Sequence, residues 1–217
     1  MLVPGATLRV SEIFQSIQGE STRAGLPTVF VRLTGCPLRC VWCDTEYAFT
    51  GGANMTIETI LAQVADIGSP TVCVTGGEPL AQKACLPLLK ALCDAGYSVS
   101  LETSGALDIT AVDKRVSRIV DLKAPDSGEV QKNLWSNIDQ LNGNDELKLV
   151  LASEADYDWA KSVLATRRLA ERCPVILSPA SGRLEPSLLA EWILRDRLPV
   201  RFQLQLHKVI WGAERGR

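Results

Sequence analysis

The sequence of 217 residues predicts an α/β fold with a mainly parallel sheet, because short β-branched segments alternate with segments of helical periodicity. A helix between two strands returns the chain to the same end of the sheet, so about six such strands imply parallel neighbours. Polar clusters follow most of the predicted strands, at the sheet edge where parallel α/β folds carry their chemistry. No repeat or linker marks a boundary, so we expect residues 1–217 to form one domain.

The N-terminal part of the chain predicts a hairpin arm followed by the first strands and helix of the sheet. Residues 8–14 alternate between polar and apolar side chains, and residues 28–33 form a β-branched strand that leads into a cysteine-rich loop. Thr56 is a predicted N-cap for a helix over residues 57–66. The strand predicted over residues 71–75 then ends in a Gly-Gly-Glu-Pro turn.

The rest of the chain repeats this alternation. Residues 125–144 lack clear periodicity, so we expect them to form a long insertion or a cover over one end of the sheet. Further helices are predicted over residues 86–95, 109–116, 154–172 and 186–195. Further strands are predicted over residues 98–102, 118–122, 146–151, 174–177 and 200–206.

Charge and hydropathy exclude several classes of partner. The chain has 23 Lys and Arg against 25 Asp and Glu, in no long blocks of one sign, so we expect it to bind neither nucleic acid nor an anionic membrane. No leader pattern or apolar stretch of spanning length is present, which favours a cytoplasmic protein. A small molecule is the expected partner.

Three cysteines in one short loop, Cys36, Cys40 and Cys43, are the strongest chemical signal. Their C-x3-C-x2-C spacing fits three positions around one ion or three metal atoms of one cluster. A zinc site needs a fourth ligand, and the only histidine is His207, far along the chain. An iron-sulfur cubane held by three cysteines would keep one iron for another ligand, such as a cofactor with adjacent amino and carboxylate groups.

The four other cysteines have a different character. Seven cysteines in a chain that we expect to be cytoplasmic argue against a disulfide framework and favour metal ligation plus buried thiols. Each of the four has apolar neighbours in sequence and is expected to pack in the core as a small hydrophobic residue. They are Cys73, Cys85, Cys93 and Cys173.

The cysteine loop, with Trp42 before its third cysteine, resembles that of the radical S-adenosylmethionine (SAM) enzymes, which bind three irons of a [4Fe-4S] cluster and leave the fourth for SAM. Residues 76–79 resemble the second signature of that superfamily, which binds the amino group of SAM. Most of the chain is similar to the 7-carboxy-7-deazaguanine synthases of the queuosine pathway. The segments that carry this similarity are residues 14–20, 30–36, 43–45, 102–105 and 205–208.

The resemblance implies a partial (β/α)6-type barrel with an N-terminal hairpin arm and reduced or irregular helices. It also implies a lyase that converts 6-carboxy-5,6,7,8-tetrahydropterin to 7-carboxy-7-deazaguanine by ring contraction with loss of ammonia. The implied cofactors are a [4Fe-4S] cluster, SAM and Mg²⁺. A homodimer and an electron donor such as flavodoxin are the implied protein partners.

The same resemblance assigns expected roles to individual residues. Cys36, Cys40 and Cys43 would bind the cluster, and Thr45 would bind Mg²⁺. The expected substrate contacts are Ile17, Gln18, Gly19, Arg32, Thr75 and His207. The expected SAM contacts are Trp42, Cys43, Asp44, Gly77, Glu78, Ser104, Asp121, Lys123 and Ser178.

Several of these residues have simpler alternatives. Arg32 suits a carboxylate, but it could instead pair with an acid across the sheet. Thr45 could cap a helix or turn, and His207 could be a buried core histidine. The chain also departs from the family pattern: many members have Ser where this chain has Asp121 and Gly where it has Ser21. These departures leave the role of Asp121 and the local turn geometry open.

Two other functions share part of the pattern. A radical SAM activating enzyme that acts on a protein partner would use the same cysteine loop, but it would need a groove for a polypeptide. A non-catalytic metal-binding module would need only the cysteines. Iron and sulfide analysis would separate the module from both enzymes, and an assay with the carboxypterin would separate the two enzymes.

Overall fold

One open sheet runs through the part of the chain that the computed structural model describes, residues 5–212 and 214–216. Its nine described strands lie in the order β3-β1-β2-β4-β5-β6-β7-β8-β9, so β3 and β9 are the edges. The strands are β1 (Thr7–Ile17), β2 (Pro27–Leu33), β3 (Ala53–Thr56), β4 (Thr71–Gly76), β5 (Ser98–Thr103), β6 (Ser117–Asp121), β7 (Glu146–Leu151), β8 (Val175–Pro179) and β9 (Arg201–Phe202).

The hairpin arm is confirmed, and the sheet beyond it is parallel. Strand β1 pairs antiparallel with both β2 and β3, whereas every pairing from β2–β4 to β8–β9 is parallel. The β1–β2 register places Glu12 opposite Arg32 and Phe14 opposite Phe30. The sequence did not predict β3, a four-residue edge strand with little burial. The strand therefore lacked the alternation of a half-buried segment.

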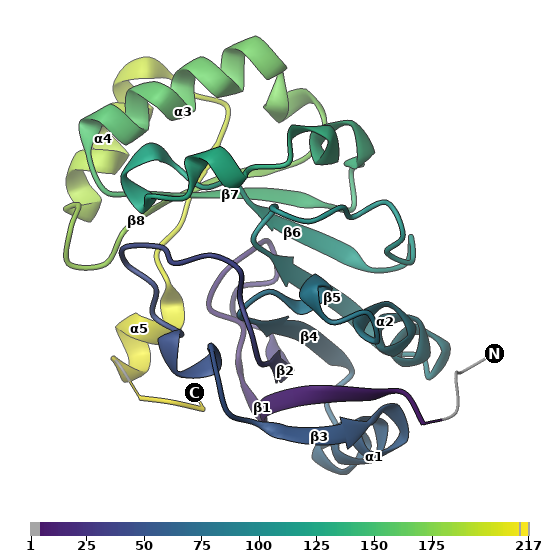
Figure 1. Cartoon of the computed structure of the whole chain (residues 1–217). Helices are drawn as coiled ribbons and strands as arrows, with labels where there is room; N and C mark the ends of the chain where they lie inside the picture. Colours follow the sequence, from purple (N-terminus) through teal and green to yellow (C-terminus); the bar gives the residue numbers. More distant parts are fainter. Residues whose placement is uncertain (1–4, 213, 217) are drawn as a thin grey trace.

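Helices cover the outer face of the sheet, with α1 and α2 near one end of the strand order and α3 and α4 near the other (Figure 1). The predicted cap of α1 is confirmed, because the Thr56 hydroxyl accepts a hydrogen bond from the Thr59 N–H. The helices are α1 (Ile57–Ile67), α2 (Cys85–Asp94), α3 (Glu154–Arg167), α4 (Pro186–Asp196) and α5 (Leu206–Trp211). No described helix is both long and apolar enough to cross a membrane.

The two faces of the sheet differ in chemistry. Outward residues of the central strands, such as Val31 in β2 and Val74 in β4, are fully buried against the helices and form the hydrophobic core. Side chains alternate along a strand, so Arg32 and Thr75 point to the opposite, inner face. The helices thus bury the apolar face and leave the inner face for polar groups.

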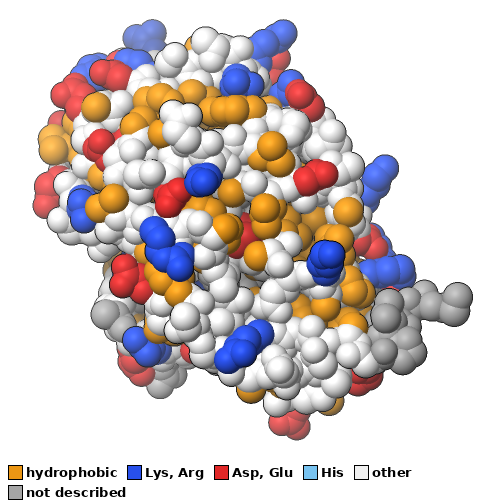
Figure 2. Space-filling view, in the orientation of Figure 1, with side chains coloured by type: hydrophobic (Ala, Val, Ile, Leu, Met, Phe, Trp, Pro, Cys, Tyr) orange, Lys and Arg blue, Asp and Glu red, His pale blue; other side chains and the backbone are white. Residues whose placement is uncertain are grey.

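The outer surface carries charges of both signs. Figure 2 shows Lys and Arg side chains interspersed with Asp and Glu on the face in view, without a large patch of one sign. This distribution agrees with the nearly balanced charge of the sequence. It offers no extended basic surface on that face.

The helix predicted over residues 109–116 is wrong, because this stretch forms two successive turns. The Asp108 carboxylate accepts a hydrogen bond from the Thr110 N–H, and the Asp113 carboxylate accepts one from the Arg115 N–H. Short acidic side chains that bond to the backbone two residues on compete with helix formation. The apolar spacing that suggested a helix instead anchors the turns, since Ile109 is fully buried.

Two other boundaries differ from the prediction. The helix predicted over residues 154–172 ends at Arg167, because Arg168 adopts a left-handed conformation with φ of 52° and a 3-10 turn follows at Leu169–Glu171. The strand predicted over residues 200–206 is only β9, two residues long, and Leu206 begins α5 instead. The apolar residues Phe202 and Leu204 are exposed, so the alternation there does not reflect a buried strand face.

Residues 125–144 connect β6 to β7 without an α-helix. They form three 3-10 segments, η3 (Pro125–Ser127), η4 (Val130–Lys132) and η5 (Trp135–Gln140). The Asn137 amide donates hydrogen bonds to the Gly105 and Leu107 carbonyls, 3.1 and 2.8 Å away, and so ties the stretch to the loop after β5. Together with the turns at 109–116, this stretch makes the helical layer irregular next to β6, as the resemblance implied.

Candidate active site

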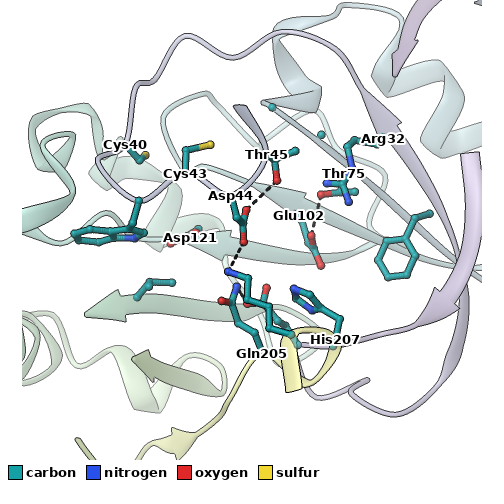
Figure 3. A pocket seen from close by; sticks show the side chains of 18 of the residues that line it. Arg32, Cys40, Cys43, Asp44, Thr45, Thr75, Glu102, Asp121, Gln205 and His207 are labelled. Atoms are coloured by element: carbon teal, nitrogen blue, oxygen red, sulfur yellow. Dashed lines mark hydrogen bonds and ion pairs between the residues drawn. The ribbon is translucent and has the colours of Figure 1, made fainter. Parts of the chain in front are cut away.

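A polar cavity of about 880 Å³ occupies the inner face of the sheet, at the carboxyl ends of the strands. Strands β1, β2, β4, β5, β6 and β7 contribute lining residues, and the cysteine loop and the C-terminal segment line it as well. Figure 3 shows Cys40 and Cys43 toward one end and Arg32 toward the other, with Asp44 and Glu102 between them. The polar clusters that follow the strands in sequence therefore meet in one place.

The cysteine loop is held in shape by backbone and guanidinium contacts. The Arg39 guanidinium donates hydrogen bonds to the carbonyls of Cys36 and Leu38, at 2.8 and 2.7 Å. The loop also bonds to its surroundings, because the Val41 N–H donates to the Ser127 carbonyl at 3.0 Å. These contacts fix the loop through its backbone and leave the three thiols free to bind a ligand.

The thiols fit a multi-iron cluster better than a single ion. All three loop cysteines are half-buried, line the cavity and form no disulfide in the described chain. A tetrahedral ion would need its sulfur ligands within about 4 Å of one another. No three His, Cys, Asp or Glu side chains of the described residues converge on one ion position. In a cubane each cysteine binds a different iron, which suits thiols that are spread around a loop.

The electrostatic surroundings of the thiols act in two opposite directions. Burial raises the pKa of Cys36, Cys40 and Cys43, so the free thiols would be protonated at neutral pH. The charge of Lys123 opposes this shift at each of them. The Lys123 ammonium is itself paired with the Asp121 carboxylate at 2.9 Å. A serine in place of Asp121 could not form this ion pair.

Thr45 does not act as a cap. It precedes the 3-10 segment η1 (Glu46–Ala48), but its hydroxyl makes no capping hydrogen bond and donates to Asp44 Oδ1 at 2.9 Å. The other oxygen of Asp44 pairs with Lys208 Nζ at 2.7 Å. The capping alternative is therefore wrong, and both oxygen-bearing side chains lie at the cavity wall.

Arg32 forms an ion pair across the sheet and also lines the cavity, so its two interpretations are compatible. Its Nε donates to Glu12 Oε1 at 2.7 Å, across the β1–β2 pair, so the cross-strand ion pair exists. Arg32 also lines the cavity, with its guanidinium carbon 5.7 Å from the centre of the Phe14 ring. The Tyr47 hydroxyl donates to the same Glu12 oxygen at 2.7 Å. Since Nε is occupied, the Nη edge of the guanidinium is the one left for a ligand.

Glu102 places a carboxylate on the inner face at the end of β5. It accepts hydrogen bonds from the Thr75 hydroxyl at 2.8 Å and from the Gln18 amide at 3.2 Å. His207 lies nearby (Figure 3) and is half-buried at the cavity rather than in the core, so the core-histidine alternative is wrong. Burial lowers the pKa of His207, which keeps the ring neutral near pH 7.

Most of the residues singled out in the sequence line this cavity, but Glu78 and Ser178 do not. Glu78 is fully buried behind the wall and accepts hydrogen bonds from the Leu80 N–H at 2.9 Å and the Ser104 N–H at 2.7 Å. The Ser178 hydroxyl is buried without a hydrogen-bond partner among the described residues. A direct role for either residue in SAM binding remains a prediction.

The structure adds residues that received no role from the sequence. Glu20 and Gln205 belong to the motif segments, and Lys148 is, with Glu146, one of two charged residues in the strand over residues 146–151. Phe14 and Tyr47 were passed over because single aromatic residues usually belong to cores. The further lining residues of this kind are Phe14, Glu20, Tyr47, Glu102, Lys148, Arg183, Gln205, Lys208 and Arg215.

Ser21, where many family members have glycine, has a left-handed backbone with φ of 71°. Its hydroxyl accepts a hydrogen bond from the Arg23 N–H at 3.0 Å, which is how a serine tolerates this turn. We expect Ser21→Ala to lower the free energy of unfolding by about 1 kcal/mol or more, because the strain stays and the bond is lost. Ser21→Gly should lose less, because it relieves the strain. Chemical denaturation of both variants tests this, and equal losses would contradict it.

The chain belongs to the radical SAM superfamily. The family model described as "Radical SAM superfamily" matches residues 30–178, a range that holds the cysteine loop, most of β2 and β8, and every described strand from β3 to β7. Iron-sulfur and SAM chemistry at this cavity is what membership of the superfamily implies.

Within the superfamily, the chain belongs to the 7-carboxy-7-deazaguanine synthases. It is 53% identical over 212 residues to a protein of that name from Chlorobaculum tepidum, covering 96% of both chains. It is 40% identical over 222 residues to one from Koribacter versatilis, covering 95% of this chain and 98% of that one. The crystal structure of QueE from Escherichia coli matches with a TM-score of 0.77 and 26% identity, covering 93% of this chain and 95% of the other.

Proposed function

We propose that this protein converts 6-carboxy-5,6,7,8-tetrahydropterin to 7-carboxy-7-deazaguanine with loss of ammonia. The observation that supports this most strongly is that the thiol loop, Arg32 and Glu102 line one cavity. A cluster-binding loop would account for the radical chemistry. The positive charge of Arg32 suits the pterin carboxylate, and the negative charge of Glu102 suits the N–H groups of the pterin ring. Anaerobic assay of the iron-loaded enzyme with this carboxypterin, SAM and a reductant tests the proposal, and no deazaguanine product would contradict it.

The cysteine loop would hold the cluster, and the cavity wall around it would hold SAM. When bound, the cluster and SAM together supply a one-electron cleavage that makes a carbon radical able to abstract a substrate hydrogen atom. The protein contributes position and exclusion of water. The wall proposed for SAM is lined by Trp42, Asp44, Gly77, Ser104, Asp121 and Lys123. Glu78 supports that wall from behind through its hydrogen bond with the Ser104 N–H.

The far end of the cavity would hold the pterin. The Nη edge of Arg32 suits the substrate carboxylate, because a planar guanidinium can grip both of its oxygens. The Glu102 carboxylate suits the 2-amino and ring N–H donors of the pterin, which point in the same direction. A neutral His207 can donate or accept one hydrogen bond, and Phe14 offers a ring face to the heterocycle.

Mg²⁺ would bind at Thr45. Mg²⁺ takes few protein ligands when substrate oxygens and water complete its octahedron, and the Thr45 hydroxyl lies between the thiol loop and the proposed pterin end. Asp44, whose oxygens meet Thr45 and Lys208, provides negative charge beside that position.

We expect Thr45→Ala to raise the Mg²⁺ concentration needed for half-maximal activity by about tenfold or more, with iron content unchanged. Thr45→Ser keeps the hydroxyl and should behave like the wild type. Titration of Mg²⁺ into chelator-treated enzyme measures both variants. Full activity of the wild type without any divalent ion would contradict the proposal that Mg²⁺ binds at Thr45.

The chain is further proposed to act as a single domain, as a homodimer in the cytoplasm, reduced by a small donor such as flavodoxin. The family resemblance supports the dimer and the donor, and the single nine-stranded sheet of the described residues supports the single domain. Light scattering at several concentrations measures the oligomeric state. Substitution of flavodoxin for a chemical reductant in the assay tests the donor.

A further inference from the structure

The loop that follows β1 supports the C-terminal segment. The loop, residues 18–22, follows β1 and turns in toward β7. There the Thr22 N–H donates a hydrogen bond to the Glu146 carboxylate at 2.8 Å, and Lys148 Nζ meets Glu20 Oε2 at 2.5 Å. Glu146 and Lys148 are two residues apart in β7, so they lie on the same face of the strand. The loop is thus attached to β7 at two neighbouring points.

The C-terminal segment, residues 203–208, lies on this loop. The Gln203 amide donates to the Ser21 carbonyl at 2.8 Å, and the Leu206 N–H donates to the Gly19 carbonyl at 2.9 Å. The approach is close, because a Cβ added to Gly19 would lie 2.1 Å from His207 Nδ1. Glycine at position 19 therefore allows the His207 ring to rest directly on the loop.

Glu20 joins the loop, β7 and the C-terminal segment. One carboxylate oxygen faces Lys148, and the other accepts a hydrogen bond from the Gln205 amide at 2.8 Å. Its exposed fraction is only 7%, so both partners matter for the stability of the charge. Burial alone would raise the pKa of Glu20, but the Lys148 charge and the two hydrogen bonds lower it, so the carboxylate is ionised at neutral pH.

We propose that Glu20 is a positioning residue that, through Gln205, holds the C-terminal segment so that His207 faces the pterin. This rests on the proposed function, because it takes the pterin as the ligand of His207. Both partners of Glu20 are donors, and a glutamine at position 20 has one acceptor oxygen for the two of them. Glu20→Gln therefore keeps the shape of the side chain but cannot keep both contacts.

The chain provides a matched control in Glu146→Gln. Glu146 is 2% exposed, lies in the same strand as Lys148 and binds the same loop, but it has no hydrogen bond to the C-terminal segment in the described chain and does not line the cavity. We expect Glu20→Gln to increase hydrogen–deuterium exchange of residues 203–212 in the ligand-free enzyme by about tenfold or more, and Glu146→Gln to leave it near the wild-type rate. The KM for the carboxypterin should rise about tenfold in Glu20→Gln, with a smaller change in kcat.

A second variant keeps the proposal testable if Glu20→Gln does not fold. Gln205→Met retains the pair between Glu20 and Lys148 and removes only the contact to the segment, so it should raise exchange and KM in the same direction. Unchanged exchange in Gln205→Met, or equal increases in Glu20→Gln and Glu146→Gln, would overturn the proposal. If the wild type fails to convert the carboxypterin, the proposed function fails, while the exchange data still decide whether Glu20 holds the segment.

Discussion

Alanine in place of Cys36, Cys40 or Cys43 is expected to abolish product formation and the visible absorbance of the cluster. Each thiol would bind a different iron, so the loss of one thiol leaves that iron without its protein ligand. The loop itself should persist, because Arg39 and the backbone hold it rather than the sulfurs. The variants should therefore remain folded, with an unfolding free energy within about 1 kcal/mol of the cluster-free wild type.

Cys93→Ala is the matched control for these variants. Cys93 is half-buried like the loop cysteines, but it lies in α2 on the outer side of the sheet. Its removal should leave iron content, sulfide content and turnover unchanged. Iron and sulfide analysis after anaerobic reconstitution, with absorbance spectra, compares all four variants. A loop variant that keeps a full cluster, or a Cys93 variant that loses it, would show that the wrong cysteines had been assigned.

The strands were readily predicted from the sequence because burial of the outer face demands apolar residues. Segments such as β4 and β7 are bounded by turn residues and rich in Val and Leu, and their predicted limits lie within a residue of the observed ones. The helix at 109–116 was mispredicted because its apolar residues fit a helix while its aspartates bind the backbone of turns. Local hydrogen bonding of that kind leaves no mark in hydrophobic periodicity.

The site residues that directly follow a strand could be predicted from the sequence. Contacts between residues far apart in the chain could not. The cysteine loop and the polar residues after β4, β5 and β6 follow strands directly, so their meeting at one edge could be expected. The partnership of Glu20 with Lys148 and Gln205 joins residues 128 and 185 positions apart, which no local pattern reveals. The cross-strand pair of Glu12 and Arg32 was partly predictable. The sequence predicted the hairpin arm, but not the register that places these two residues opposite each other.

Arg32→Lys is expected to lower kcat/KM for the carboxypterin by about tenfold to a hundredfold, which corresponds to about 1.5–3 kcal/mol for a lost charged hydrogen-bond pair. In the proposed site the arginine would serve two carboxylates with different edges, because Nε is bound to Glu12 at 2.7 Å and the Nη edge would bind the substrate. A lysine has one compact ammonium, which cannot hold Glu12 and grip both oxygens of a second carboxylate.

The pterin carboxamide supplies the matched comparison for Arg32→Lys, because it lacks the charge that Arg32 is proposed to bind. If Arg32 binds the carboxylate, the variant should lose much less on the carboxamide than on the carboxypterin, and the difference measures the coupling between the two groups. Glu12→Gln should cause a smaller loss with the carboxypterin, since it weakens the anchor of Arg32 without removing the guanidinium. Steady-state kinetics or, for an unreactive analogue, competition binding gives these values. Equal losses on both ligands would mean that Arg32 supports the sheet through Glu12 and does not bind the substrate carboxylate.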